Sequence, residues 1–218
     1  IFAVRAAWLE PGMAPYFGSV EYMRAESWRE FEAALNRWGA PSENQVYADS
    51  DGNIGYKPAG LFPRRPNWDG LMPVPGDGRY EWNGFFDMDV LPSEFNPQRG
   101  FTGTANSMNL PGDYPIAKYP IGFEWNDGWR YQRLWQVLSE QDAHTLDDSK
   151  DLQRDFVSLL AREAIARIPK DDQQPAAQML REFDADMTAN SSEAALYAVW
   201  FFRHLRPGLE KVLSPNAP

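Results

Sequence analysis

Cysteine is absent from the 218-residue sequence, and only two histidines occur, His144 and His204. Without cysteine the chain has no disulfide framework, no thiolate metal ligand and no cysteine nucleophile. Two histidines are too few for a multi-histidine zinc site. The sequence therefore predicts no metal site and no cofactor.

Positive charge is also scarce, because 21 Lys and Arg stand against 31 Asp and Glu, for a net charge of -10. A nucleic-acid partner needs a basic surface and is not expected. No run of about 18 apolar residues occurs, so no segment is predicted to span a membrane. The chain begins at Ile1 rather than Met, inside a stretch, 1–4, that is typical of a strand. This start suggests a fragment or a processed product of a longer protein.

The composition that remains is typical of a folded protein, with 43% hydrophobic and 24% charged residues. Residues 57–115 hold nine of the 18 prolines and eight of the 16 glycines, which favours turns and short strands. Between 121 and 205 only Pro169 and Pro175 occur, and helical periodicity takes over. We predict one α+β fragment over 1–218, with a strand- and loop-rich part, 1–120, and a helical part, 121–218.

Local signals in the first part predict a helix and a hairpin. Ser27 and Glu30 have the spacing of a capping box. The residues that follow place a stripe of large apolar side chains on one helical face: Trp28, Phe31, Leu35 and Trp38. Residues 46–48 and 53–56 are predicted strands on either side of the turn signal Asp51-Gly52. A further short strand is expected over 100–105.

Three helices are predicted in the second part. One covers 130–139. Thr145 is expected to cap a long helix with an apolar face made of Leu152, Phe156, Leu159 and Leu160. The last runs from about 193 to 205, with Ala194, Ala198, Phe201 and Leu205 in period.

Local chemical motifs are few. Asp49, Asp51 and Asn53 alternate like the start of an EF-hand, but that loop needs Gly at its sixth and Glu at its twelfth position. Ile54 and Gly60 stand there instead, so a hairpin turn is the better interpretation. Several tryptophans suggest stacking platforms for sugars, and two of them, in the loop-rich region, stay open: Trp68 and Trp82. A group of carboxylates is attributed to a solvated surface: Asp87, Asp89 and Glu94.

Three ordered motifs carry a resemblance to a known family. They are YADSDGNIGY at 47–56, LMPVPG at 71–76 with YEWNG at 80–84, and NPQRGF at 96–101 leading into Thr104-Ala105-Asn106. Their order and spacing resemble the penicillin acylase family, and the similarity extends over nearly the whole chain. The resemblance implies part of the αββα architecture of N-terminal nucleophile hydrolases.

Members of that family are amidohydrolases made as precursors that cleave themselves into two subunits. The new N-terminal Ser attacks the amide while its own α-amino group takes the proton. Family substrates are acylated amides such as β-lactam side chains and acyl-homoserine lactones. The resemblance places this chain inside the second (β) subunit, downstream of the nucleophile and inactive alone. Its implied partners are the α subunit and the N-terminal part of the β subunit, and its implied location is the periplasm or outside the cell.

The resemblance assigns roles to two residues. Asn106 resembles the oxyanion-hole Asn of the family, whose side-chain amide stabilises the tetrahedral intermediate. The alternative is an Asn that ends a strand and turns the chain. Arg130 resembles an Arg that supports the active site and precursor processing, and its alternative is a solvated helix residue.

Departures from the family pattern concern calcium and the acyl pocket. Lys118 stands where the penicillin G acylases carry a calcium-binding Asp, and a cation cannot ligate calcium. Two acyl-pocket positions correspond to Ser19 and Glu43, so the acyl specificity is expected to differ from that of a penicillin G acylase. The second hypothesis for the chain is a non-catalytic module on the same scaffold, either a degenerate acylase or a sugar-binding, tryptophan-rich domain.

Overall fold

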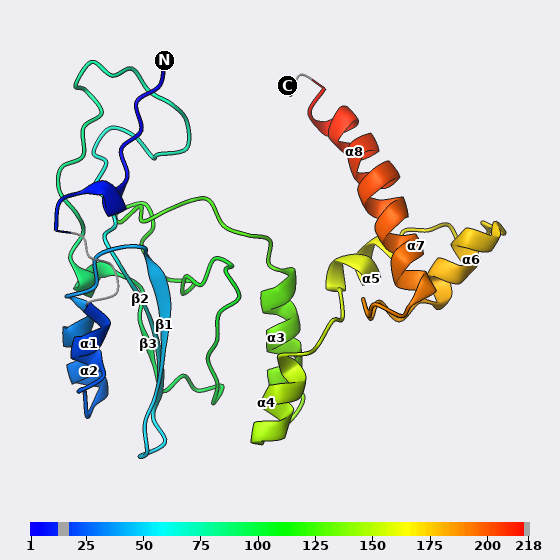
Figure 1. The fold of residues 1–218 in the computed structure, drawn as a ribbon, viewed down its shortest axis with the longest axis horizontal. Helices are drawn as coiled ribbons and strands as arrows, with labels where there is room; N and C mark the ends of the chain where they lie inside the picture. The colour runs from blue at the N-terminus through cyan, green and yellow to red at the C-terminus, as the bar shows by residue number, and fades with distance from the viewer. Residues whose placement is uncertain (13–17, 216–218) are drawn as a thin grey trace. The chain divides into compact units, whose positions relative to one another are not determined.

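The computed structural model describes residues 1–12 and 18–215, which form two compact units, 1–126 and 127–218. The first unit holds a three-stranded antiparallel sheet with short helices, and the second is helical (Figure 1). Elements of the first unit are η1 (Ala7–Leu9), α1 (Ser19–Tyr22), α2 (Trp28–Leu35), β1 (Glu43–Ala48), β2 (Ile54–Ala59), η3 (Met88–Val90) and β3 (Glu94–Phe95).

Elements of the second unit are α3 (Trp129–Ser139), α4 (Leu146–Leu152), α5 (Leu159–Ile165), α6 (Pro175–Glu182), α7 (Ser192–Trp200), the π-helical segment η4 (Phe201–Leu205) and α8 (Arg206–Leu213). Among the described residues, no helix is long and apolar enough to cross a membrane.

Helix α2 begins at the predicted cap. The Ser27 hydroxyl accepts a hydrogen bond from the Glu30 N–H at 3.3 Å, and the Glu30 carboxylate accepts the N–H of Glu26 at 2.8 Å. The carboxylate thus reaches one residue beyond the cap itself. Two donors that would otherwise be unpaired at the helix start are satisfied in this way.

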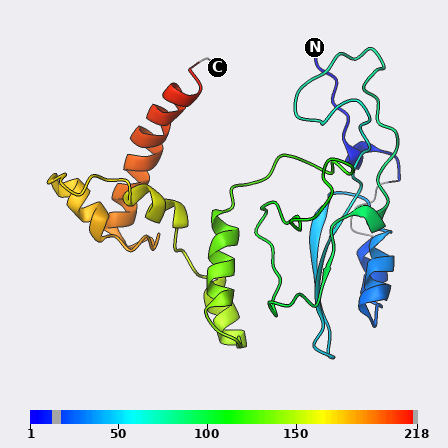
Figure 2. The same cartoon turned by 180° about the vertical axis from the view of Figure 1, so that it is seen from behind.

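The apolar face of α2 supplies the core of the first unit. Figures 1 and 2 show α1 and α2 on one side of the sheet. Leu35 is fully buried there. The core cluster consists of Phe31, Leu35, Trp38, Tyr47, Ala59, Met88, Leu91 and Ile121. The predicted stripe is confirmed in part: Phe31, Leu35 and Trp38 are buried in this core, but α2 ends at Leu35, so Trp38 lies beyond the helix.

The hairpin between β1 and β2 is confirmed, and Asp49 holds its turn. The Asp49 carboxylate accepts hydrogen bonds from the N–H groups of Asp51 and Asn53, from Asn53 Nδ2 and from the Tyr47 hydroxyl. The Asn53 side chain is the main cause of a lowered pKa at Asp49. Gly52 has a positive φ of 86°, as the turn requires. The alternating carboxylates therefore belong to turn structure.

Gly55 of the central strand β2 lies under the indole of Trp28. A Cβ built on Gly55 would approach Trp28 Cζ3 to 2.4 Å, well inside van der Waals contact. The register pairs Gly55 with Tyr47 on one side and Phe95 on the other. The glycine is needed here because the ring packs directly on the strand backbone.

Two predicted strands are absent from the described structure. Residues 1–4 and 100–105 have no ladder hydrogen bonds, so the prediction of a strand at each was wrong. Both stretches have strand-like composition, but a strand also needs a neighbouring edge to pair with. Ile1, Phe2 and Val4 are exposed, and Thr104 contacts β1 through its side chain.

The long helix predicted after Thr145 is broken in two. Thr145 and Asp148 form a reciprocal capping box, which confirms the cap, but α4 ends at Leu152. A new helix, α5, starts at Leu159 with Ser158 as its cap. Between them, the Asp155 carboxylate accepts the N–H of Val157 at 3.0 Å, which favours a turn over helix continuation.

The last helix begins as predicted but continues beyond 205 to Leu213. Pro207 lacks an N–H, and its ring would clash with the carbonyl of residue 203 in a regular α-helix. The π-helical turn of η4, in which the Arg206 N–H bonds to the Phe201 carbonyl, widens the backbone just before the proline. The chain therefore passes the proline without ending the helix.

The core of the second unit gathers apolar side chains from α5, α6, α7 and the segment just after α6: Ala161, Ala164, Ile165, Leu180, Phe183, Ala185, Ala194 and Tyr197. Arg133 of α3 binds both carboxylate oxygens of Asp155, with Nη2 to Oδ2 at 2.6 Å. Their side chains are 19% and 16% exposed. This ion pair holds α3 to the segment before α5.

The Arg133 hydrogen bonds lower the pKa of Asp155. A carboxylate whose pKa is depressed on folding stabilises the fold above its unfolded pKa of about 3.9, and that stability is lost as pH falls through the folded value. We expect Asp155→Asn to destabilise the protein at neutral pH and to flatten the loss of unfolding free energy below about pH 4. Urea unfolding across this pH range measures the effect.

Asp151→Asn is the matched control, since the exposed Asp151 of α4 pairs with the exposed Arg154 just beyond the helix. An equal change in the pH dependence for both variants would contradict the role of the Arg133–Asp155 pair.

Candidate functional site

Asn106 is exposed and lines an open hollow of about 390 Å³ on the first unit. Its φ is 59°, in the left-handed region. Asn tolerates this region better than most residues because its side chain is short and polar. The hollow is lined by Asn44, Asn106, Ser107, Glu124, Trp125 and Asn126.

Two hydrogen bonds restrain the chain at Asn106 and just after it. The Asn126 N–H donates to the Asn106 carbonyl at 3.3 Å. Ser107, the next residue, is buried and donates its hydroxyl to Asn109 Oδ1 at 3.0 Å. The Asn106 side chain is therefore exposed, while its backbone is restrained by hydrogen bonds. Such a residue can hold its side-chain amide in one position.

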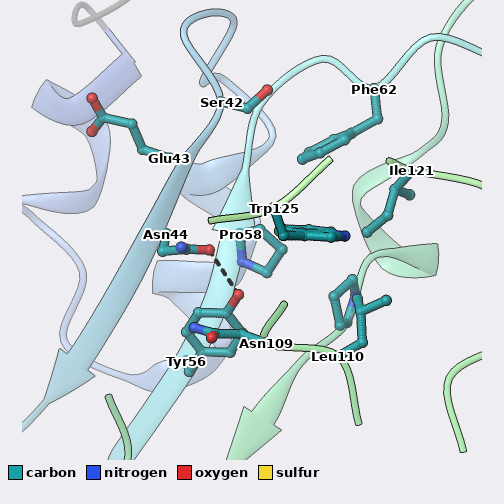
Figure 3. A pocket seen from close by; sticks show the side chains of 11 residues that line it. Ser42, Glu43, Asn44, Tyr56, Pro58, Phe62, Asn109, Leu110, Ile121 and Trp125 are labelled. Carbon is teal, nitrogen blue, oxygen red and sulfur yellow. Dashed lines mark hydrogen bonds between the residues drawn. The ribbon is translucent and has the colours of Figure 1, made fainter. Parts of the chain in front are cut away.

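Asn44 of β1 connects the sheet to the segment that carries Asn106. The Tyr56 hydroxyl donates to Asn44 Oδ1 at 2.7 Å (Figure 3), and Asn44 Nδ2 donates to Thr104 Oγ1 at 2.9 Å. Asn44 also lines the hollow that contains Asn106. Sequence reasoning missed this residue, because nothing in the sequence near Asn44 marks it.

A smaller cavity of about 120 Å³ adjoins Asn44 and shares Trp125 with the hollow. Figure 3 shows the rings of Phe62 and Trp125 gathered with Ile121 at this cavity. Asn109 Nδ2 is a buried donor without a hydrogen-bond partner among the described residues. The cavity is thus mostly apolar, with one unused donor in a lining residue.

Of the two predicted acyl-pocket positions, Glu43 lines this cavity, whereas Ser19 is not among its lining residues. Figure 3 shows the Glu43 carboxylate pointing away from Phe62 and Trp125. Neighbouring residues on a strand point to opposite faces, so Glu43 and Asn44 present their side chains in opposite directions. Ser19 is the first residue of α1 and is partly buried.

Arg130 lies in the first turn of α3, in the second unit, and is exposed. The structure therefore places the two predicted site residues in different units. Lys118 is exposed in a turn, with its ammonium 4.8 Å from the centre of the Tyr119 ring. Over the ranges 1–12 and 18–215, no three acidic, His or Cys side chains are grouped to hold a metal ion.

Trp68 and Trp82, the two tryptophans whose role the sequence leaves undecided, pack against arginines. The Arg65 guanidinium lies 5.7 Å from the ring centres of both Trp68 and Trp82, and Arg5 lies 4.5 Å from that of Trp82. The Trp68 indole N–H also donates to the Met72 carbonyl at 2.9 Å. Cation–π contacts thus account for these rings as structural parts of the loop region.

The predicted solvated carboxylates differ in their surroundings. Asp87 and Asp89 are exposed. Glu94 is partly buried, forms an ion pair with Arg99 and accepts the Thr102 hydroxyl at 3.0 Å. Glu94 therefore fixes the segment that leads from β3 toward Asn106.

The fold is that of a known class. The structure superimposes on a thermostable penicillin G acylase from Alcaligenes faecalis with a TM-score of 0.69 and 23% sequence identity, over 98% of this chain and 40% of that one. The chain therefore has the α+β fold of part of a penicillin G acylase, which confirms the predicted fold class.

Sequence comparison narrows the class to a family. Residues 2–216 match the model of the penicillin amidase family. An acyl-homoserine lactone acylase, QuiP, of Pseudomonas aeruginosa is 30% identical over 91% of this chain. Penicillin G acylase of Escherichia coli is 32% identical over 70% of it. The chain belongs to the penicillin amidase family and has the scaffold of an amide-hydrolysing acylase.

The chain spans only part of these relatives. It covers 25% of the Pseudomonas aeruginosa acylase and 18% of the Escherichia coli enzyme. Another relative, the penicillin acylase 2 proenzyme of Pseudomonas sp. strain SE83, is 29% identical over 83% of this chain and is covered to 24%. This chain therefore corresponds to about a quarter of the length of such a protein.

Proposed function

We propose that this chain is the oxyanion-stabilising segment of a longer amidohydrolase, which removes an acyl group from a linear amide. The observation that carries the proposal is Asn106, an exposed amide on a fixed backbone at an open hollow. Family membership supports the reaction class.

The chemistry assigned to Asn106 is electrostatic. When a nucleophile attacks an amide carbonyl, negative charge develops on the oxygen, and a side-chain N–H fixed beforehand stabilises that charge in the transition state. Asn106 Nδ2 is the donor in this proposal. The hydrogen bond from the Asn126 N–H to the Asn106 carbonyl restrains Asn106 while negative charge develops on the substrate oxygen.

The nucleophile lies outside this chain in the proposal. It is the N-terminal Ser of a β subunit formed when a precursor cleaves itself, and its α-amino group serves as base. The relative named as a proenzyme supports processing of this kind. The 218 residues alone are then inactive, and their partners are the α subunit and the preceding part of the β subunit.

The substrates proposed are acylated amides of the classes named in the relatives, acyl-homoserine lactones and penicillins. Arg130, in the first turn of α3, is proposed to support the active site and processing from the second unit. The periplasm or the extracellular space is the proposed location, as the family resemblance implies.

Mass spectrometry of the full-length protein tests the proposal. We expect two chains, the second beginning with Ser upstream of this segment, and we expect replacement of that Ser by Ala to leave one uncleaved chain. Replacement by Ala of a Ser inside the segment, such as the exposed Ser192, is the control and leaves cleavage unchanged.

A single uncleaved wild-type chain without Ser at the matching position would contradict the proposal. It would favour the non-catalytic module, which predicts ligand binding by the 218 residues without hydrolysis.

A further inference from the structure

We propose that Asn44 and Thr104 are positioning residues for Asn106, an inference that rests on the proposed oxyanion role. Thr104 precedes Asn106 by two residues, and its hydroxyl accepts the 2.9 Å hydrogen bond from Asn44 Nδ2. The bond ties the segment before the oxyanion donor to strand β1.

The anchor is rigid on the sheet side. Asn44 pairs with Pro58 across the hairpin, and its Oδ1 is held by Tyr56 from the central strand at 2.7 Å. Tyr56 is only 6% exposed. Hydrogen bonds shielded from water hold their geometry better than exposed ones. The two bonds from Tyr56 to Asn44 and from Asn44 to Thr104 therefore fix the position of Thr104 relative to the sheet.

Two other contacts described at Asn106 involve its own carbonyl and the residue after it. Ser107 is buried behind it, and Asn126 binds its carbonyl at 3.3 Å. The Thr102 hydroxyl donates to Glu94 of β3 at 3.0 Å earlier in the same segment, and the Asn44–Thr104 bond joins that segment to β1 closer to Asn106, two residues before it. Loss of the Asn44–Thr104 bond should loosen the segment before Asn106 and displace the amide without removing it.

The consequence is a loss of turnover without loss of the donor. A displacement of about 1 Å at a catalytic group can cost about 100-fold in rate. Thr104→Val keeps the side-chain shape but removes the hydroxyl that accepts from Asn44. We expect it to lower kcat of the full-length processed enzyme by about 10- to 100-fold with little change in KM.

A double-mutant cycle with Asn106→Ala separates positioning from general damage. If Thr104 acts through Asn106, then Thr104→Val should cost little further kcat once the amide is gone. Thr104→Ser restores the hydroxyl and should recover most of the lost turnover. Tyr56→Phe is the second variant, because it removes the hydroxyl that donates to Asn44 Oδ1. Thr188→Val, at an exposed position in the second unit, is the control.

Each outcome has a distinct meaning. Additive losses in the double variant, or no rescue by Ser, would overturn the positioning role while leaving the oxyanion role intact. A Thr104→Val variant with normal kcat would also overturn it. Near-normal turnover of Asn106→Ala alone would instead contradict the proposed function itself.

Discussion

Asn106→Ala in the full-length processed enzyme should lower kcat for amide hydrolysis by about 100- to 1000-fold, or about 2.7–4 kcal/mol of transition-state stabilisation. The amide donates to charge that exists only during reaction, so KM should change little while kcat and kcat/KM fall together. Stopped or continuous assays of acid or amine release, with substrate varied around KM, measure both parameters.

Asn67→Ala is the matched control for this prediction. Asn67 also uses its side-chain amide, which donates to the Arg79 carbonyl at 2.9 Å, but it is exposed in the loop region and does not line the hollow. Its removal should leave kcat unchanged. If the two variants lost turnover equally, the oxyanion assignment would fail, since the loss would then reflect damage to the first unit as a whole.

Elements whose signals are local could be predicted from the sequence. Ser27 caps α2 through contacts that span only a few residues, and the turn at 49–53 is built by the side chain of Asp49 on its own neighbours. Such contacts form wherever the same short sequence occurs in a compatible context. The apolar face of α2, with Phe31 and Leu35, was predictable from its helical period.

Elements that depend on distant partners could not be predicted. The stretch 100–105 has strand-forming residues, yet the chain offers it a side-chain contact to Asn44 instead of a strand edge. The helix break before α5 depends on Asp155, whose partner Arg133 lies 22 residues earlier. The helix continues past the end expected near 205 because η4 forms a π-helical turn before Pro207. The spacing of the apolar residues does not reveal that turn.

The residues of the candidate site could be identified from the sequence only through the family resemblance. By its residue type alone, Asn106 is a common turn residue, and its positive φ agrees with that interpretation as well as with the functional one. Asn44 was not found at all, because its partners, Tyr56 and Thr104, lie 12 and 60 residues away. Side-chain relays of this length become visible only when the strands are paired.

Leu35→Ala should lower the unfolding free energy by about 2–5 kcal/mol. Leu35 is fully buried between the α2 backbone and the sheet, at the centre of a core that also holds Phe31 and Trp38. Aromatic neighbours are rigid and collapse poorly around a lost side chain, so a cavity should remain. Chemical denaturation of wild type and variant, at constant pH and salt, measures the change.

Leu9→Ala is the control, because Leu9 is 71% exposed in η1 of the same unit, and its removal should change stability by no more than about 0.5 kcal/mol. The same core supports β1, and through Asn44 it supports the loop of Asn106. We therefore expect Leu35→Ala to lose activity at a lower temperature than wild type while keeping a normal kcat below its own unfolding transition. Equal stability of the two variants would show that the α2 face is not the core of this unit.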